Sequence, residues 1–335
     1  MEKRIKDRYS DAIYQEALAR HNIKLDQVTS MDGFESFIYE FARREQGYIL
    51  RISHSLRRSP GQIAGEIDWI NYLADHGVPA ARAVGSAQNN LVEAIDDGHK
   101  GFFLATAFEK APGKHIKPEA WNGDFFERYG RLLGRMHALS QKYRPPKPAW
   151  KRPEWDDPEM LDLKPWIPAS EPLVTERWLE LEAHLATLPK DVAGYGLIHQ
   201  DAHAGNFFVD EEGHMTLFDF DDSIYGWYGY DIAIVLFYAI MGEPDWPAFT
   251  HSFMSRFLKG YAQENRLSPA WLREIPHFLK LREIDLYAVI HRSFDVQNLD
   301  HPWVIRYMDG RRERIETGQP FIDFDFTALE SYLAG

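Results

Sequence analysis

Residues 196–222 read GLIHQDAHAGNFFVDEEGHMTLFDFDD, and the rest of the chain is best interpreted from this stretch. Its apolar start predicts a short strand, which leads through a polar loop into two β-runs at residues 207–209 and 215–218. Gly213 lies in the turn between the two runs, where glycine can adopt the positive φ that hairpin turns need. The stretch therefore predicts a polar loop held between a strand and a β-hairpin.

Three polar side chains stand at fixed offsets on this frame. Asp201 and Asn206 lie five positions apart in the loop, and Asp219 ends the second β-run. A loop carboxylate can accept the proton of a hydroxyl, while an amide oxygen and a second carboxylate are the hard oxygen ligands that Mg²⁺ prefers. These are the components of phosphoryl transfer, in which positioning and charge neutralisation supply most of the catalysis.

The sequences HQDAHAGN and LFDFDD resemble the aminoglycoside phosphotransferase and choline kinase-like family, a group of small-molecule relatives of the protein kinases that includes homoserine kinase-like and bacterial stress-kinase branches. The resemblance implies that Asp201 is the catalytic base and that Asn206 and Asp219 hold Mg²⁺ for ATP. The chain has D-F-D where protein kinases have D-F-G, which is usual for this group.

The resemblance also implies supporting residues around the loop. His199 is expected to support the loop rather than to react. Asp231, in the sequence YDIA that opens an apolar helix, resembles an aspartate that braces the loop backbone, and it also suits a helix N-cap. Asp221 and Asp222 are both candidates to approach the metal, and Asp222 is also a candidate to contact the substrate.

Upstream of the loop, β-type runs are expected at residues 27–30, 36–42 and 47–53. The turn between the first two contains Gly33 and Ser36, where a kinase places its phosphate-covering loop. An ordinary hairpin turn is the alternative interpretation of these two residues.

The third run carries a cation and the helix after it a glutamate. Arg51 alternates with apolar neighbours on the strand, where kinases usually have the lysine that holds the α- and β-phosphates. A planar guanidinium can also bind phosphate through two hydrogen bonds. A helix begins near Ser59 and carries Glu66, and the resemblance implies that this carboxylate pairs with Arg51 and directs it at phosphate.

A transition-metal hydrolase is the main competing interpretation of the loop. Imidazole and carboxylate groups suit zinc or manganese, and the candidate ligands are His199, Asp201, His203, Asp219 and Asp221. A hydrolase has no need of a strand cation paired with a helix glutamate, so the upstream residues favour the kinase. A catalytically silent relative that keeps the fold for binding stays as a third interpretation.

Further β-type runs at residues 83–87 and 101–108 complete the first lobe. Thr106 and Phe108 resemble the hinge at which kinases meet adenine, and the linker EKAPGK follows directly. We therefore expect an α+β, two-lobed, protein-kinase-like fold. Residues 1–108 would form a small nucleotide-binding lobe with an antiparallel sheet and one key helix, and residues 109–335 a larger, mainly helical catalytic and substrate-binding lobe.

The substrate side is less clearly marked. Residues 144–172 are rich in proline and contain Trp150, Trp155 and Trp166 between acidic residues. This segment is either an ordered surface loop or a flap that faces a cationic ligand with its tryptophans and with Asp156, Asp157, Glu159 or Asp162. Helices are expected at 246–265, 269–292 and 302–318, and the candidate substrate contacts on them are Glu283, Asp285, His291 and Arg292.

Composition sets the outer limits of the function. The chain has 335 residues, of which 44% are apolar, so it can form one large or two ordinary domains. It has no cysteine, which excludes disulfides and thiolate chemistry. A net charge of −13 argues against a nucleic-acid partner and is compatible with a cationic substrate. Without a signal sequence or a membrane-spanning run, we expect a cytoplasmic protein with no membrane partner.

Together these observations predict an ATP- and Mg²⁺-dependent O-phosphotransferase. The acceptor is expected to be a hydroxyl of a small, amine-bearing molecule such as an aminoglycoside, an amino alcohol or a hydroxy amino acid. A protein serine or threonine, as in a stress kinase, is the alternative acceptor. The sequence does not fix the oligomeric state.

Overall fold

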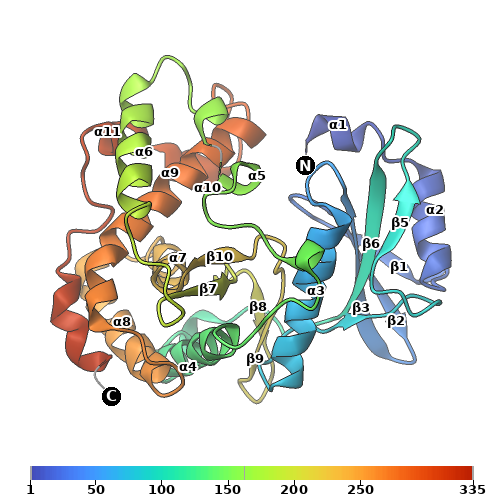
Figure 1. The fold of residues 1–335 in the computed structure, drawn as a ribbon, viewed down its shortest axis with the longest axis horizontal. Helices are drawn as coiled ribbons and strands as arrows, with labels where there is room; N and C mark the ends of the chain where they lie inside the picture. Colours follow the sequence, from blue (N-terminus) through green and yellow to red (C-terminus); the bar gives the residue numbers. More distant parts are fainter. Residues whose placement is uncertain (1, 162, 334–335) are drawn as a thin grey trace. The chain divides into compact units, whose positions relative to one another are not determined.

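The computed structural model describes residues 2–161 and 163–333 (Figure 1). The chain divides into two compact units, each assembled from separate stretches of sequence. The first unit comprises Met1–His115, Tyr143–Arg152 and Phe207–Asp221. The second unit comprises Ile116–Lys142, Pro153–Asn206 and Asp222–Gly335. A domain boundary near Phe108 stays a prediction.

The first unit is built on an antiparallel sheet in the order β1-β2-β3-β6-β4, with β5 also paired to β6. The strands are β1 (Val28–Met31), β2 (Phe37–Arg43), β3 (Gln46–His54), β4 (Ala83–Val84), β5 (Glu93–Asp96) and β6 (Phe102–Glu109). The runs predicted at 27–30, 36–42, 47–53 and 101–108 are therefore strands. β5 was not predicted, because one of its two buried positions holds Glu93, which accepts hydrogen bonds from Ser86 and Asn90.

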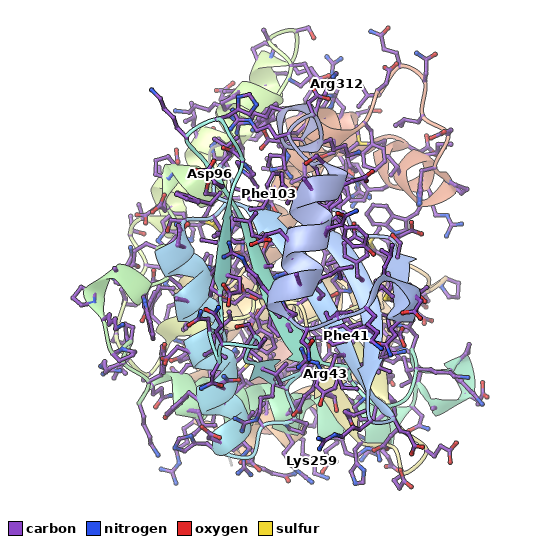
Figure 2. The ribbon with its side chains drawn as sticks, turned by 90° about the vertical axis from the view of Figure 1, so that its right-hand side faces the viewer. Phe41, Arg43, Asp96, Phe103, Lys259 and Arg312 are labelled. Atoms are coloured by element: carbon purple, nitrogen blue, oxygen red, sulfur yellow. The ribbon has the colours of Figure 1, made fainter. Side chains whose placement is uncertain are left out.

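Helices cover both faces of this sheet (Figure 1). On one face, α2 (Asp11–Arg20) buries Ile13, Ala17 and Leu18 against strand residues such as Phe41 on β2 and Phe103 on β6, both labelled in Figure 2. On the other face lies α3 (Pro60–Asp75), which begins with a capping box between Ser59 and Gln62. The short α1 (Lys3–Lys6) is separate from α2, because Ser10 at the start of α2 is extended.

The first unit also contains the hairpin of β8 (Phe207–Val209) and β9 (Met215–Leu217), as the sequence predicted. Gly213 in its turn has a φ of +83°, in the left-handed region that favours glycine. Strand β9 also bonds to the segment between α3 and β4. The Leu217 N–H donates to the Pro79 carbonyl oxygen, and the Ala81 N–H donates to the Leu217 carbonyl oxygen. The hairpin thereby fixes the direction in which residues 218–221 leave the strand.

The second unit is mainly helical. Its helices are α4 (Gly123–Ser140), α5 (Pro158–Leu161), α6 (Pro172–Leu185), α7 (Tyr228–Ala239), α8 (Trp246–Ala262), α9 (Ile275–Ser293), α10 (Pro302–Met308) and α11 (Arg311–Glu316). Short 3₁₀ turns lie at η4 (Lys164–Trp166), η5 (Pro269–Glu274) and η6 (Phe326–Tyr332), among others. Strands β7 (Tyr195–Ile198) and β10 (Ile224–Trp227) pair antiparallel. Throughout the described ranges no helix is long and apolar enough to cross a membrane.

Helices α4 and α8 pack closely because glycine occupies the crossing on both sides. A Cβ on Gly130 would lie 1.8 Å from the Phe257 carbonyl oxygen, and one on Gly260 would lie 1.9 Å from the Glu127 carbonyl oxygen. Any larger residue would force the two helices apart. The helix predicted over 302–318 is interrupted, because Gly310 adopts a φ of +63° between α10 and α11.

Candidate active site

The buried carboxylate of Asp231 holds the backbone of the loop after β7. Asp231 on α7 accepts hydrogen bonds from the backbone N–H groups of His199 (3.0 Å) and Gln200 (2.8 Å). The Nε2 atom of His137 lies 3.0 Å from the same carboxylate, and its Nδ1 atom lies 2.9 Å from the Tyr261 hydroxyl. The structure therefore shows the expected contact between Asp231 and the loop backbone. The expectation that Asp231 caps a helix was wrong, because α7 begins at Tyr228 and Asp231 lies in its first turn.

The bracing supports a strained loop. Gln200 has a φ of +66°, which a non-glycine residue rarely adopts. The neighbouring His199 is fully buried, and its Nδ1 atom accepts a hydrogen bond from the Asp201 backbone at 3.3 Å. His137 is also fully buried, and burial lowers its pKa even though Asp231 opposes the shift. These contacts fix the backbone from which the Asp201 side chain projects.

Three side chains converge on the Asp201 carboxylate. Asn206 donates through Nδ2 to Oδ2 at 2.9 Å and to the Asp201 backbone oxygen at 2.9 Å. Arg282 donates to Oδ1 at 2.8 Å, and the Nε2 atom of His203 lies 3.3 Å from Oδ2. Burial raises the pKa of Asp201, but His203 and Arg282 outweigh burial and hold it below the usual range. Since the side chain is still 20% exposed, Asp201 is an anion that a ligand can reach.

Arg282 is a site residue that the sequence analysis missed. It lies on α9, where it also bonds Asp285 at 2.8 Å and the Tyr238 hydroxyl at 2.6 Å. Burial raises the pKa of Asp285 despite this contact with Arg282. The available signal was the three-residue spacing of Arg282 and Asp285, which places opposite charges on one helix face. Only Asp285 was identified as a candidate.

The donors available for a divalent ion suit a hard cation. Because both hydrogen bonds of the Asn206 amide use Nδ2, its Oδ1 atom points away from Asp201 and forms no hydrogen bond within the described part of the chain. In the first unit, Asp219 follows β9 with a φ of +63° and an exposed side chain. An amide oxygen and a carboxylate are the ligand types that Mg²⁺ and Ca²⁺ take. The chemistry of these two residues therefore fits such an ion.

Four of the predicted nucleotide-binding residues form one cluster in the first unit. Arg51 donates to both carboxylate oxygens of Glu66, at 2.8 and 2.7 Å, and both side chains are buried. Thr106 pairs with Arg51 in the register of β3 and β6. The Arg51 guanidinium lies over the Phe108 ring, 5.0 Å from its centroid. The pairing of Arg51 with Glu66 was predicted from the sequence and is present.

The other two, Gly33 and Ser36, lie in the connection between β1 and β2. A Cβ on Gly33 would meet the Ser36 carbonyl oxygen at 2.2 Å, so this turn requires glycine. Both residues line a small cavity together with Lys6 and residues of the flanking strands.

Asp221 is engaged by arginines within the first unit. Its carboxylate pairs with Arg57 and lies 3.8 Å from Arg51. Its backbone oxygen accepts from Arg152 at 2.6 Å and from Arg58 at 3.4 Å. Asp221 therefore balances several buried cations. A zinc-type ligand set of the kind that the hydrolase hypothesis needs is not formed here: in residues 2–161 and 163–333, clusters suited to such an ion lie at other positions.

The remaining substrate candidates are scattered over the second unit. Trp166 in η4 is 43% exposed, and Asp222 and His291 are partly buried. Glu283 is fully buried in ion pairs with Arg311 of α11 and Lys280 of α9, both at 2.6 Å, so it joins these two helices. Trp155 is a core residue that packs on Trp227. Of the acidic candidates in the proline-rich segment, Asp162 and the side chain of Glu159 lie outside the described residues.

A pocket in the second unit was not predicted from the sequence. Its cavity volume is about 680 Å³, and its lining includes Ala204 of the loop and Tyr238, the residue that bonds Arg282. The other lining residues are Ile116, Lys117, Pro118, Trp121, Asn122, Gly123, Phe126, Ala239, Gly242, Glu243, Phe249 and Ser252. The pocket thus joins aromatic walls and two opposite charges to the Asp201 loop.

Two features define the protein-kinase-like class of phosphotransferases. One is an antiparallel sheet whose strand cation pairs with a helix glutamate, and the other is a helical unit with an acidic loop. Comparison with known proteins agrees. A sequence profile of the phosphotransferase enzyme family matches residues 32–274, and the chain belongs to this family.

Individual relatives point in the same direction. The chain is 40% identical over 325 residues to an amicoumacin kinase of Bacillus subtilis (strain 168), with 96% of both chains covered. A solved amicoumacin kinase in complex with AMP-PNP, Ca²⁺ and Ami is 39% identical, with a TM-score of 0.92 over 98% of this chain and 100% of that chain. A microcompartment-associated aminopropanol kinase shares the fold, with 24% identity, a TM-score of 0.72 and coverage of 92% of this chain and 98% of that chain.

The protein is therefore an ATP-dependent phosphotransferase that acts on an alcohol group with a divalent metal ion as cofactor. The family resemblance, the kinase-like fold class and the enzyme class expected from the sequence are confirmed.

Proposed function

We propose that this kinase phosphorylates a hydroxyl of a drug-sized, amine-bearing molecule bound in the pocket beside the Asp201 loop, and that Mg²⁺ is its metal. The observation that carries the proposal is the lining of this pocket, which combines loop residue Ala204 with aromatic walls and a carboxylate. A volume of about 680 Å³ suits a drug-sized ligand better than ethanolamine or choline.

The pocket chemistry indicates what such a ligand carries. Trp121, Phe126 and Phe249 offer apolar and aromatic contact, and Glu243 offers a carboxylate to an ammonium group. Lys117 adds a cation that an amide or carboxylate group of the ligand can meet. The similarity to amicoumacin kinases makes amicoumacin the first acceptor to test.

The proposed mechanism assigns the acceptor hydroxyl to Asp201. As an anion, Asp201 accepts a hydrogen bond from the hydroxyl, orients its oxygen towards the γ-phosphate and takes its proton. Arg282 and Asn206 hold the carboxylate in one orientation. The proton leaves the hydroxyl oxygen as that oxygen bonds the γ-phosphorus and the bond to the ADP oxygen breaks.

The nucleotide is assigned to the cluster in the first unit. Glu66 holds Arg51 by two hydrogen bonds, so the guanidinium is preorganised to direct its remaining positive face at phosphate. Asn206 and Asp219 would each give an oxygen to the metal, which neutralises phosphate charge when it is bound. Thr106, Phe108, Gly33 and Ser36 are the further residues proposed to contact ATP.

A protein acceptor is the second candidate, and one observation bears on it. The chain is 30% identical over 129 residues to stress response kinase A of Escherichia coli (strain K12). That similarity covers 38% of this chain, whereas the amicoumacin kinase similarity covers 96%. The small-molecule acceptor is therefore better supported.

The test is ADP release from Mg·ATP against a panel of acceptors, with Asp201→Asn as the inactive control. The panel contains amicoumacin, aminoglycosides, choline, homoserine and a dephosphorylated protein extract. We expect turnover with a drug-sized amine acceptor and none with the small amino alcohols. Turnover restricted to the extract would replace the proposal by a protein kinase. No turnover with any acceptor, together with unchanged melting in Mg·ADP, would reject the active enzyme.

A further inference from the structure

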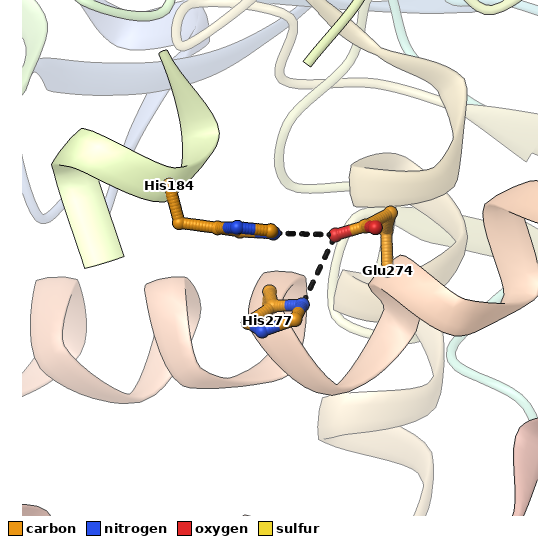
Figure 3. Close-up of side chains that lie close together, drawn as sticks. All are labelled: His184, Glu274 and His277. Carbon is orange, nitrogen blue, oxygen red and sulfur yellow. Dashed lines mark hydrogen bonds and ion pairs between the residues drawn. The ribbon is translucent and has the colours of Figure 1, made fainter. Parts of the chain in front are cut away.

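A cluster in the second unit, made of His184, Glu274 and His277, takes no part in the proposed reaction (Figure 3). His184 lies in the last turn of α6, Glu274 ends η5 and His277 lies in the first turn of α9. One nitrogen from each imidazole and one carboxylate oxygen all lie within 4.8 Å of one another. Three different elements thus bring two imidazoles and a carboxylate to one point.

The two histidines contact the same oxygen atom, Oε2 of Glu274. The Nε2 atom of His184 lies 2.8 Å from Oε2 of Glu274, and the Nδ1 atom of His277 lies 3.0 Å from it. The His184 contact is a hydrogen bond. The Nδ1 atom of His277 is buried, and its 3.0 Å contact with Oε2 of Glu274 lacks the geometry of a hydrogen bond. A buried nitrogen without a well-formed hydrogen bond calls for a partner, and a metal ion between it and Oε2 would supply one.

Simultaneous protonation of His184 and His277 is unfavourable in this arrangement. The two rings lie 4.0 Å apart between centroids, so a positive charge on both would be strongly repulsive. Metal binding requires the neutral imidazole.

From the convergence of these three side chains we propose that His184, Glu274 and His277 form a binding site for a zinc-like transition-metal ion, separate from the ATP metal. Two imidazoles and one carboxylate are a ligand set that suits Zn²⁺. In a tetrahedral Zn²⁺ site, ligand atoms lie roughly 3.3 Å apart, as follows from bonds of about 2.0 Å. The two nitrogen–oxygen distances of 2.8 and 3.0 Å need to open by only a few tenths of an ångström.

The cluster is accessible enough to load an ion and to keep a water on it. The side chains of His184, Glu274 and His277 are 37%, 21% and 43% exposed. A bound ion would join the end of α6 to the start of α9, two helices that already pack together. The ion would therefore act as a cross-link that stabilises the second unit. The proposal does not depend on the identity of the acceptor.

A second group, Asp210, Glu212 and His214, serves as a comparison. It lies in the β8–β9 turn, where Asp210 accepts from the His214 backbone at 2.7 Å and lies 3.1 Å from its Nδ1 atom. These contacts are explained by the turn itself, and the His214 side chain is 75% exposed. His214→Ala is therefore a matched histidine control.

The experiment measures Zn²⁺ binding by calorimetry on the full chain, after chelation and with Mg²⁺ and AMP-PNP in excess. The hard Mg²⁺ does not compete for imidazole ligands. We expect one equivalent of Zn²⁺ to bind to the wild type and to raise its melting temperature. His184→Ala, His277→Ala and Glu274→Gln should each weaken binding at least tenfold and abolish the increase, whereas His214→Ala should change neither.

Absence of zinc binding to the wild type, or equal binding by the cluster variants, would overturn the proposal. Co²⁺ gives a readout that needs no variant. Bound at this cluster, it should show the visible absorption of a low-coordinate site and paramagnetically shifted imidazole protons. A spectrum identical to that of aqueous Co²⁺ would reject the site even if a variant failed to fold.

Discussion

Two arginine clusters, one in each unit, show how similar ion pairs can serve different purposes. In the first unit, Arg51 uses two hydrogen bonds on the single carboxylate of Glu66, and both are buried. In the second unit, Arg282 divides its hydrogen bonds between Asp201 and Asp285. The first arrangement satisfies one carboxylate completely. The second leaves two carboxylates sharing one guanidinium.

Sharing has an electrostatic consequence. Two acids that share one cation differ in pKa when their other surroundings differ. Burial raises the pKa of Asp285, whereas His203 and Arg282 together keep that of Asp201 low. The anion is thereby assigned to Asp201, the acid that a ligand can reach. The Arg51 cluster orients a cation, and the Arg282 cluster orients an anion.

Removal of the anion is expected to have the largest effect. Asp201→Asn keeps nearly the same side-chain shape, but its amide can accept from only one of Asn206 and Arg282 and cannot take the hydroxyl proton. We expect kcat to fall by about 10³-fold. Nucleotide affinity should be unchanged, because the Arg51 cluster is intact. Steady-state kinetics and calorimetry with Mg·AMP-PNP check the two parts, and a parallel loss of nucleotide binding would remove Asp201 from its assigned role.

Removal of the cation that orients this anion comes next. In Arg282→Gln the Asp201 carboxylate loses its 2.8 Å contact and can rotate, so kcat should fall roughly 100-fold with little change in acceptor KM. Because Arg282 lowers the pKa of Asp201, its loss raises that pKa. The acid limb of the kcat/KM profile should then move to higher pH.

Arg282→Lys separates positioning from folding. The lysine keeps the positive charge, so the acid limb should return most of the way while kcat recovers in part. A purely structural role for Arg282 predicts instead that both variants lose stability with an unchanged pH profile. A kcat/KM profile measured from acid to neutral pH distinguishes these outcomes.

The difference between the two clusters also explains what could be predicted from sequence. Local patterns placed Arg51 on a strand with alternating apolar residues and Glu66 on a helix with an apolar face, and the family resemblance implied that the two side chains pair. The contact of Arg282 with Asp201 spans 81 positions, and no local pattern reports it. The pocket was missed for the same reason, since its lining comes from three separate segments.

Asp231 shows where local reasoning gave the wrong structural role. An aspartate at the start of an apolar helix suits an N-cap, yet α7 begins three residues earlier as a continuation of β10. The carboxylate instead serves backbone groups 31 and 32 positions away. The buried N–H groups of the loop need a hydrogen-bond acceptor, and Asp231 serves them instead of capping the helix.

Breaking the first cluster should affect stability more than catalysis. Glu66→Gln leaves the buried Arg51 without its main counter-charge, and the unfolding free energy should fall by about 3 kcal/mol. The KM for ATP should rise roughly tenfold, because the guanidinium is no longer held in place. Glu180→Gln, which removes an exposed pair with Arg177, is the control and should cost less than about 0.5 kcal/mol. Denaturant unfolding of Glu66→Gln and Glu180→Gln tests whether the Arg51–Glu66 pair stabilises the fold more than the exposed Arg177–Glu180 pair does.

The smallest expected effect concerns the acceptor pocket, and it tests whether substrate charge is sensed separately from both clusters. Glu243 is partly exposed, so its attraction for an ammonium group is screened by water. Glu243→Gln should raise the KM for an amine-bearing acceptor about fivefold, with kcat and the KM for ATP unchanged. An N-acetylated form of the same acceptor has no charge to lose and should show no such increase. Equal sensitivity of the two acceptors would mean that Glu243 shapes the pocket, and that selection for the amine is made elsewhere on its wall.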